Sequence, residues 1–337
     1  MIKTISIDKA LELKEATFID TRTPKEFEED NIPESINKPL FSNNERAIVG
    51  TLYKNNQSEA YEKGLEIYNQ KVLDFIDEFK KLDSTKPIII YCWRGGMRSK
   101  VITELIVNIG LDAYQLEGGY KSFRKHVMKY FEDYKLKSKL LVLQGLAGNG
   151  KTDLLKNINP SIDLEGIAKH RSSLFGAIGL EPVSQKMFES RLWVKLEELK
   201  NEKIIFIEGE AKKIGKINMP MLLFDEMQKA VTIKIETQIE NRVKRIVKDY
   251  FSHEEDELIK KIISSLKVHL SNAKVEELNA FVDKKDYEPV AKYLLEEYYD
   301  SRYEHAINEI KFKYTISNDN QATAIEKLKK IAAKESE

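Results

Sequence analysis

Residues 140–152 read Leu-Leu-Val-Leu-Gln-Gly-Leu-Ala-Gly-Asn-Gly-Lys-Thr, an apolar run that leads directly into a glycine-rich segment. The part from Gly145 to Thr152 matches the pattern G-x-x-x-x-G-K-[ST] at every fixed position. A loop of this kind, between a buried strand and a helix, directs its backbone N–H groups at phosphate oxygens. The segment therefore predicts an α/β fold in which a central parallel strand ends in a phosphate-binding loop.

The residues of this loop have separate expected roles. Lys151 is expected to reach the terminal phosphate, and Thr152 to contact Mg²⁺ where a metal accompanies the phosphates. No tightly bound cofactor is expected beyond this optional Mg²⁺. The backbone cradle around the phosphates is expected to consist of Gly145, Gly148, Asn149 and Gly150.

Polar residues further along the second half are candidates to surround the phosphate site. Glu208 ends the apolar run 204–208, where phosphate-loop proteins often carry a metal-linked carboxylate; a solvated strand end is the alternative. His170 beside Arg171 is a candidate for phosphate binding or proton transfer, and a structural histidine is the alternative.

A second loop with chemical potential follows the apolar run 87–91. Cys92 is the only cysteine of the chain, and Arg94, Arg98 and two glycines lie within the next six positions. Backbone N–H groups at a strand-to-helix turn and nearby guanidinium groups both favour a thiolate. This pattern predicts a nucleophilic Cys92, with Arg94 and Arg98 stabilising an anion formed on it. A small buried hydrophobe is the alternative role for a lone cysteine.

Composition sets broad limits on the protein class. The 337 residues include 55 Lys+Arg and 55 Asp+Glu, so a uniformly basic nucleic-acid-binding surface is excluded. No apolar run approaches the roughly 20 residues that span a bilayer, and residues 1–14 lack the apolar core of a signal peptide. A single cysteine excludes an intramolecular disulfide and a multi-cysteine zinc site. We therefore expect a soluble, cytoplasmic protein with no membrane partner.

Alternating strand-like and helix-like runs predict two α/β domains, residues 1–135 and 136–337. The first should contain a parallel sheet, and the second should resemble P-loop NTPases with added helices. A helix is predicted at 100–109, ended by Gly110. Strand-like runs are 17–20, 87–91 and 113–116 in the first half, and 140–143, 204–208, 230–235 and 314–318 in the second.

The loop around Cys92 resembles the active-site loop of rhodanese-like domains. Asp20-Thr21-Arg22, the stretch 31–37 and Leu116-Glu117-Gly118-Gly119-Tyr120 are similar to other parts of the same pattern. The resemblance implies a rhodanese-like first domain in which Cys92 carries sulfur or selenium, with Asp20 and Arg22 near the site. The Cys-x5-Arg spacing also occurs in cysteine phosphatases, so the loop alone leaves both chemistries open.

The fusion of this domain to a P-loop domain resembles the tRNA 2-selenouridine synthases. Similarity extends through residues 39–54, 163–189, 208–215 and 294–303. Two positions depart from the family pattern: Ser172 stands where the family has glycine, and Ala211 where it has serine. These departures concern local loop geometry.

This resemblance implies an activity and a set of substrates. The family converts 2-thiouridine at the wobble position of tRNA to 2-selenouridine, through S-geranyl-2-thiouridine made from geranyl diphosphate. Selenophosphate is the selenium donor, so an enzyme that produces selenophosphate is an expected partner. Two other interpretations remain at this point: a cysteine phosphatase or arsenate-reductase-like enzyme, and a nucleotide-gated sulfur-relay scaffold.

Two basic segments are candidates for contact with tRNA despite the zero net charge. The stretch 121–139 holds seven Lys/Arg, among them Arg124, Lys125 and Lys129, with aromatic residues between them. The second candidate is a predicted helix that carries Arg242 and Arg245. For each segment, a solvated helix face is the alternative.

Overall fold

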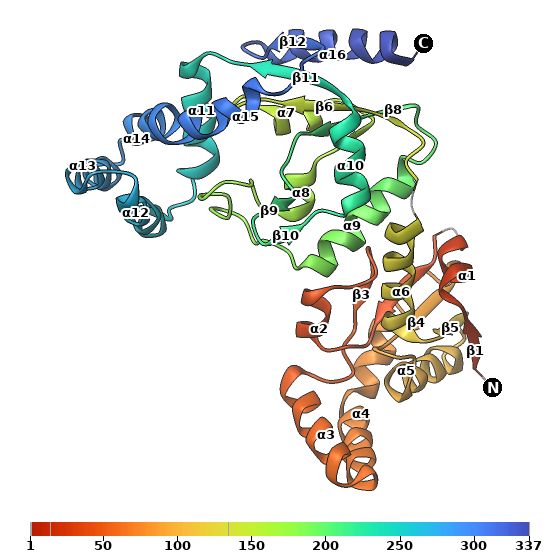
Figure 1. Cartoon of the computed structure of the whole chain (residues 1–337). Coiled ribbons are helices and arrows are strands. Elements are labelled where there is room, and N and C mark those ends of the chain that lie inside the picture. The colour runs from red at the N-terminus through yellow and green to blue at the C-terminus, as the bar shows by residue number, and fades with distance from the viewer. Residues whose placement is uncertain (1, 14, 134, 337) are drawn as a thin grey trace. The chain divides into compact units, whose positions relative to one another are not determined.

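Two α/β units make up the chain, coloured from red to yellow and from yellow-green to blue in Figure 1. The computed structural model describes residues 2–13, 15–133 and 135–336. The first unit comprises Met1–Asp133 with Glu189–Trp193, and the second comprises Tyr134–Phe188 with Val194–Glu337. The short stretch Glu189–Trp193 was assigned by sequence to the second domain.

The first unit is built on a five-stranded parallel sheet in the order β1-β5-β4-β2-β3. Its central strand, β4, carries Ile88, Ile89, Ile90 and Tyr91, all of them buried, as expected of a strand covered on both faces. The predicted parallel α/β class is confirmed here. The strands are β1 (Lys3–Ile5), β2 (Thr17–Asp20), β3 (Ile36–Asn37), β4 (Ile88–Tyr91) and β5 (Ala113–Leu116).

In the described part of this unit, six helices surround the sheet or extend from it. The predicted helix at 100–109 is α5, which begins three residues earlier, and Gly110 follows it with a φ of +93°. The hydroxyl of Ser42 and the side chain of Asn56 cap the two helices of a long hairpin, α3 and α4. The helices are α1 (Ile7–Glu12), α2 (Pro24–Glu29), α3 (Asn43–Asn55), α4 (Gln57–Phe79), α5 (Met97–Asn108) and α6 (Gly119–Asp133).

The second unit has its own five-stranded parallel sheet in the order β12-β11-β6-β8-β7. The apolar run 140–143 lies in the central strand β6, and all four of its residues are buried. A short antiparallel hairpin, β9–β10, lies apart from the sheet. The strands are β6 (Lys139–Gln144), β7 (Ser161–Ile162), β8 (Ile204–Glu208), β9 (Lys213–Ile214), β10 (Ile217–Asn218), β11 (Val231–Glu236) and β12 (Tyr314–Ser317).

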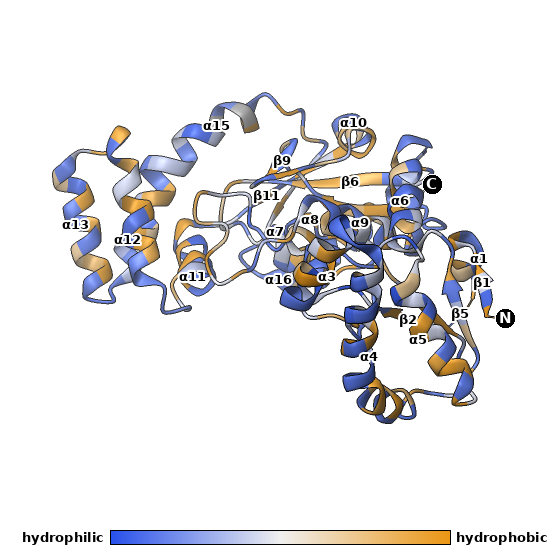
Figure 2. Cartoon of the chain, turned by 90° about the horizontal axis from the view of Figure 1, so that it is seen from below, coloured by the Kyte–Doolittle hydropathy of each residue, from blue (hydrophilic) through white to orange (hydrophobic). Residues whose placement is uncertain are grey.

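Added helices follow β11, as the sequence predicted. They pack around a separate apolar core that includes Val243, Ile259, Val282 and Leu294. Figure 2 shows the hydrophobic and hydrophilic stripes that α12 and α13 present along their length. Four helices precede β11: α7 (Lys151–Lys156), α8 (Leu164–Ala168), α9 (Gln185–Glu198), which includes the stretch Glu189–Trp193 of the first unit, and α10 (Met221–Lys229). The helices described after β11 are α11 (Ile239–Tyr250), α12 (Asp256–Ser265), η1 (Leu266–Val268), α13 (Asn272–Asp283), α14 (Tyr287–Tyr293), the π-helix η2 (Leu294–Asp300), α15 (Ser301–Asn308) and α16 (Gln321–Ser336).

A helix that spans a bilayer needs about 20 consecutive, mostly apolar residues. Within residues 2–13, 15–133 and 135–336, no helix combines the length and hydropathy of a membrane span.

A buried ion pair lies at the end of β2. The Arg22 guanidinium donates from Nε and Nη2 to Asp20 Oδ2, at 3.0 and 2.6 Å, and from Nη2 to Asp30 O at 2.7 Å. Both side chains are at most 1% exposed, and the guanidinium lies 3.9 Å from the ring centroid of Tyr120. Removing one partner would leave the other charge buried without compensation.

We predict that Arg22→Met lowers the free energy of unfolding of the first unit by about 3–5 kcal/mol, because Asp20 would keep an unpaired buried charge. The double variant Asp20→Leu/Arg22→Met, which removes both charges, should lose less than Arg22→Met alone. Both tryptophans of the chain belong to this unit, so urea unfolding followed by tryptophan fluorescence measures it. Lys3→Gln, at an exposed ion pair with Asp112, is the control and should change little. An equal or larger loss in the double variant would contradict the prediction.

Candidate active-site loops

The phosphate loop connects β6 to α7. Gly148 and Gly150 have φ values of +77° and +75°, a left-handed conformation that favours glycine. A Cβ atom at Gly150 would also lie 2.7 Å from Asn318 Nδ2 and 3.0 Å from Arg245 Cζ. The backbone geometry and the close packing around it therefore explain the two glycines without reference to a ligand.

The carbonyl groups of this loop are bound by side chains from α11 and from the residue after β12. Arg242 Nε donates to Ala147 O at 2.8 Å, Arg245 Nη1 donates to Gly148 O at 3.2 Å, and Asn318 Nδ2 donates to Asn149 O at 2.8 Å. In a planar trans peptide, the N–H group points away from the C=O group. Fixing these carbonyls therefore fixes the opposite directions of the loop N–H groups, which is what a phosphate cradle requires.

Arg242 and Arg245, which the sequence predicted as tRNA contacts, bind the phosphate loop instead. Arg242 is buried and forms an ion pair with Asp300, with N–O distances of 2.8 and 2.6 Å. Arg245 is half-buried and also donates to Asn318 O at 2.8 Å. Both guanidinium groups hold the phosphate loop and do not form an exposed basic face. The sequence shows the two positive charges on the predicted helix, but it does not show the carbonyl oxygens that accept hydrogen bonds from them.

Lys151 contacts the backbone of the loop, and Thr152 contacts a neighbouring carboxyl group. Lys151 Nζ donates to Gly145 O at 2.8 Å, and the Thr152 hydroxyl donates to Glu165 Oε2 at 3.3 Å. Glu208 is fully buried, and its Oε1 accepts the backbone N–H of Glu165 at 2.6 Å. Glu208 is therefore not a solvated strand end.

Four carboxyl groups gather beside this loop, and their proximity disfavours full ionisation. Burial and the nearby carboxylates of Glu210 and Asp163 raise the pKa of Glu165 to about 8. Burial, with the charge of Glu165, raises the pKa of Glu208 well above its ordinary value. Burial also raises the pKa of Asp163 and that of Glu210. In the described part of the chain, no group of three or more His, Cys, Asp or Glu has the arrangement of a metal site.

The Cys92 loop connects β4 to α5. Cys92 Sγ lies 3.2 Å from the backbone N of Gly96 and 3.2 Å from Ser99 Oγ, both of which donate to it. Arg98 forms an ion pair with Glu26 at 2.9 Å, whereas Arg94 is exposed. The sulfur is therefore held by neutral donors, and Glu26 balances the Arg98 charge. Ser99 is outside the residues that the sequence predicts for this site, although its place in the first turn of the following helix is readable from the sequence.

Asp20 and Arg22 form the buried ion pair described above. Their hydrogen bonds go to each other and to Asp30 O, so the pair supports the end of β2. Tyr91, the residue before Cys92, lies over the same guanidinium, 5.7 Å from ring centroid to Cζ. The ion pair of Asp20 and Arg22 therefore lies beside the residue that precedes Cys92.

His170 and Arg171 lie after α8. A Cβ atom at Gly176 or at Gly215 would come within 2.7 Å of the His170 ring, so the imidazole packs against two glycine backbones. Burial and the Arg171 charge lower the pKa of His170, which favours a neutral ring. Arg171 Nη1 donates to Ile178 O at 2.9 Å, and its guanidinium lies 5.0 Å from the Tyr250 ring centroid. These contacts hold both side chains in place beside α8, and the Nδ1 atom of His170 is buried without a hydrogen-bond partner in the described residues.

The candidate tRNA-binding residues on α6 divide into two groups. Arg124 is paired with Glu189, so its charge is already balanced. Lys125 and Lys129 are exposed, and so is Lys121 one turn earlier. Spaced four residues apart, these three lysines follow one face of the helix.

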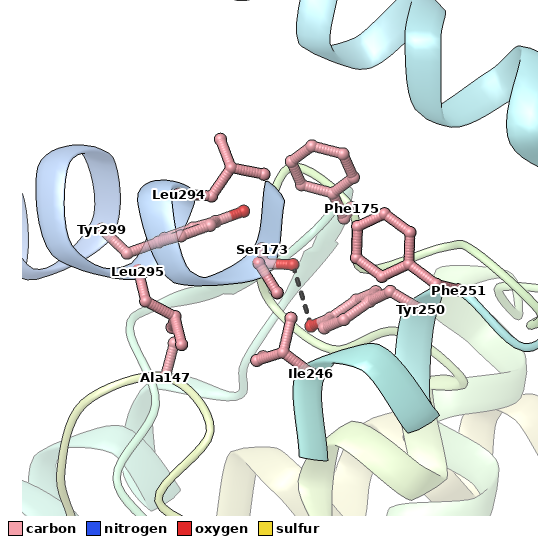
Figure 3. A pocket seen from close by; sticks show the side chains of 10 residues that line it. Ala147, Ser173, Phe175, Ile246, Tyr250, Phe251, Leu294, Leu295 and Tyr299 are labelled. Atoms are coloured by element: carbon pink, nitrogen blue, oxygen red, sulfur yellow. Dashed lines mark hydrogen bonds between the residues drawn. The ribbon is translucent and has the colours of Figure 1, made fainter. Parts of the chain in front are cut away.

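An apolar pocket adjoins the phosphate loop (Figure 3); the empty space among its lining residues, open solvent included, is about 340 Å³. Ala147 of the loop contributes to its wall, and the Ser173 and Tyr250 hydroxyls meet there at 3.1 Å. Tyr299 OH is buried without a hydrogen-bond partner in the described residues. The other lining residues come from the added helices and from the loop after α8: Phe175, Ile246, Phe251, Ala291, Leu294 and Leu295.

Comparison with known proteins identifies the family. Residues 6–126 match the family model of the rhodanese-like domain, and residues 138–268 match that of the tRNA 2-selenouridine synthase AAA domain. A tRNA 2-selenouridine synthase of Shewanella halifaxensis is 30% identical over 339 residues, covering 90% of this chain and 92% of the relative. The chain belongs to the tRNA 2-selenouridine synthase family.

Two further comparisons give the extent of the similarity. The tRNA 2-selenouridine synthase of Nitrosomonas europaea is 33% identical over 256 residues; the match covers 72% of this chain and 65% of that relative. A crystal structure of the N-terminal domain of a Clostridium difficile 630 protein, described as ATP/GTP binding, is 45% identical with a TM-score of 0.36. That match covers 37% of this chain and 99% of the solved domain.

Family membership agrees with the sequence-based recognition of both domains. Glu165 and Asp300 were not identified as site residues by sequence, although both lie in segments that resemble the 2-selenouridine synthases. Acidic residues outside a fixed motif carry no spacing signal, so only the fold shows that Glu165 faces Thr152.

We predict that the stability of the second unit falls as the pH rises from about 5 to 8, because folded Glu165 retains a proton that the unfolded chain has lost. Glu165→Gln should flatten this fall, measured by calorimetry at several pH values. Glu276→Gln, at an exposed position on α13, is the matched control. An unchanged slope in Glu165→Gln would remove the basis for this proton.

Proposed function

We propose that this chain is a tRNA-modifying enzyme that replaces the sulfur of wobble 2-thiouridine with selenium, using geranyl diphosphate and selenophosphate. Family membership supports the tRNA substrate. One observation favours the geranyl route: the phosphate loop and the apolar pocket share Ala147. A ligand that occupies both would have a phosphate head and an apolar tail.

The pocket composition distinguishes this ligand from a nucleotide. Most of its lining residues are aliphatic or aromatic, and its polar atoms are the hydroxyls of Ser173, Tyr250 and Tyr299. A base or ribose would require several placed donors and acceptors, whereas a hydrocarbon tail requires only apolar area. Each buried methylene contributes about 0.8 kcal/mol to binding.

In the proposed first step, the sulfur of 2-thiouridine attacks C1 of the geranyl group and the C1–O bond to diphosphate breaks. Diphosphate leaves with the bonding electrons, and N3 of the uridine loses its proton. Lys151 and the loop N–H groups would stabilise the charge on the leaving group. Mg²⁺ accompanying the diphosphate would meet the Thr152 hydroxyl.

In the proposed second step, the Cys92 thiolate attacks the phosphorus of selenophosphate, the P–Se bond breaks and a selenium anion leaves; water then cleaves the S–P bond, which gives phosphate and restores the thiolate. The anion attacks C2 of the S-geranylated base, and geranylthiolate leaves. We assign the handling of this anion to the Cys92 loop, because Gly96 N and Ser99 Oγ already donate to an electron-rich atom there. A separate enzyme would supply the selenophosphate.

Two variants separate the proposed steps. Cys92→Ser should form S-geranyl-2-thiouridine but no 2-selenouridine, because a serine hydroxyl is not ionised near neutral pH. Lys151→Ala should slow geranylation on the order of 10²-fold, through loss of one cation at the leaving group. Mass spectrometry of nucleosides from thiolated tRNA incubated with both substrates measures each product. Lys156→Ala, exposed on α7, is the control for Lys151→Ala.

Assays of phosphate release and of nucleotide turnover, run beside the nucleoside analysis, test the other interpretations. Release of phosphate from an aryl phosphate without 2-selenouridine would indicate a cysteine phosphatase. Turnover of ATP or GTP without a modified uridine would indicate a sulfur-relay scaffold.

Filling the pocket should separate tail binding from phosphate binding. Ala291 is fully buried in the pocket wall, and Ala291→Leu would place three more carbons there. We predict at least tenfold weaker binding of geranyl diphosphate and unchanged binding of pyrophosphate, measured by calorimetry. Ala280→Leu, exposed on α13, is the control. Equal loss of both ligands would argue against a tail in this pocket.

We propose that the exposed lysines of α6 bind the tRNA backbone. Lys121, Lys125 and Lys129 are spaced by about 6 Å along the helix axis. Neutralising all three should weaken tRNA binding and reduce the log–log salt slope by about 2 to 3. Lys54, Lys80 and Lys81, exposed in the same unit, provide a charge-matched triple control. An unaltered salt slope would place the RNA contacts on other residues.

A further inference from the structure

The two hydrogen-bond donors to Cys92 Sγ have a common neighbour. Gly96 N and Ser99 Oγ each lie 3.2 Å from the sulfur, and both belong to groups that contact the side chain of Gln115. Gln115 lies on β5, far from the cysteine loop in sequence, and is only 7% exposed.

The amide nitrogen of Gln115 faces three acceptors. Nε2 lies 2.9 Å from Gly95 O, 3.1 Å from Gly96 O and 2.9 Å from Ser99 Oγ. Carbonyl oxygens accept and cannot donate, so the two glycine carbonyls require the nitrogen of the amide on this side. A buried side chain with this arrangement is held tightly in place.

The contact with Gly95 O determines one donor to the sulfur. Gly95 O and Gly96 N belong to the same planar trans peptide, so the carbonyl and the N–H group point in opposite directions. Gly95 has a φ of +66°, and because glycine has no side chain its backbone could also adopt other conformations. Holding Gly95 O on Gln115 therefore keeps the Gly96 N–H group on Cys92 Sγ.

The contact with Ser99 determines the second donor. Ser99 is fully buried, and its hydroxyl has a single hydrogen that can go to Cys92 Sγ or to Gly96 O, 3.1 Å away. Gly96 O already accepts the backbone N–H of Lys100 at 3.1 Å. Since Ser99 Oγ accepts from Gln115, its hydrogen is available to the sulfur.

We propose that Gln115 is a positioning residue that orients both donors onto Cys92 Sγ and thereby stabilises an anion at that atom. The inference rests on the proposed function only in taking Cys92 as the working group. It concerns the reactivity of the sulfur itself, whichever substrate the chain uses.

Alkylation of the thiolate by iodoacetamide tests this role, because Cys92 is the only cysteine in the protein. Gln115→Met keeps the side-chain length and removes the donors. At pH 7 the full-length variant should react at least tenfold more slowly, and its pH profile should move to higher pH, since two bonds to a charged acceptor are weakened. Ser99→Ala should give a smaller change in the same direction, and the double variant should lose less than the product of the two single effects.

Two measurements separate this role from a structural one. Gln70→Met, exposed on α4 in the same unit, is the matched control and should react as the wild type does. Tryptophan fluorescence confirms that each variant is folded at the pH of the assay. A Gln115→Met profile that overlays the wild-type profile would overturn the proposal, as would a slower rate with the same pH dependence. Alkylation uses neither tRNA nor selenium, so failure of the proposed function would leave this result intact.

Discussion

A loop that directs its N–H groups at an anion has its carbonyl groups on the opposite side, and these carbonyl groups need hydrogen-bond donors. In the phosphate loop and in the Cys92 loop, side chains from distant parts of the chain supply those donors. In the phosphate loop, Arg242, Arg245 and Asn318 bind consecutive carbonyls. In the cysteine loop, Gln115 binds two carbonyls and the serine that faces the sulfur. Without these partners, peptides next to glycines would have several accessible orientations.

This constraint changes the meaning of the charged residues. Three arginines that read as free positive charge are paired with carboxylates: Arg98 with Glu26, Arg124 with Glu189 and Arg242 with Asp300. The positive groups that remain exposed include Arg94 and the lysines on one face of α6. Fewer positively charged side chains are therefore exposed to attract a negatively charged ligand than the sequence suggests.

The added helices of the second unit connect the phosphate loop to a hydrophobic surface. Asp300 ends η2 and holds Arg242, while Leu294, Leu295 and Tyr299 of the same element line the pocket beside Ala147. One helical segment thus contributes both to the support of the phosphate cradle and to the apolar wall. This arrangement suits a substrate with a charged head and a hydrocarbon tail. Because different residues contact the two parts, mutations can weaken the binding of one part without the other.

The sequence by itself determined the two parallel sheets, their central strands and the two loops, because local patterns carry that information. An apolar run buried on both faces and a glycine-rich motif are readable without knowing any distant contact. The family resemblance was also readable, since it rests on the same motifs. Tertiary structure alone decided what binds those loops: Gln115 lies twenty residues beyond Gly95, and Asn318 lies 169 residues beyond Asn149. Glu165 and the pocket beside Ala147 were decided in the same way. Hydrogen bonds and burial depend on which segments the fold brings together, and single side chains of this kind have no spacing that a linear pattern could reveal.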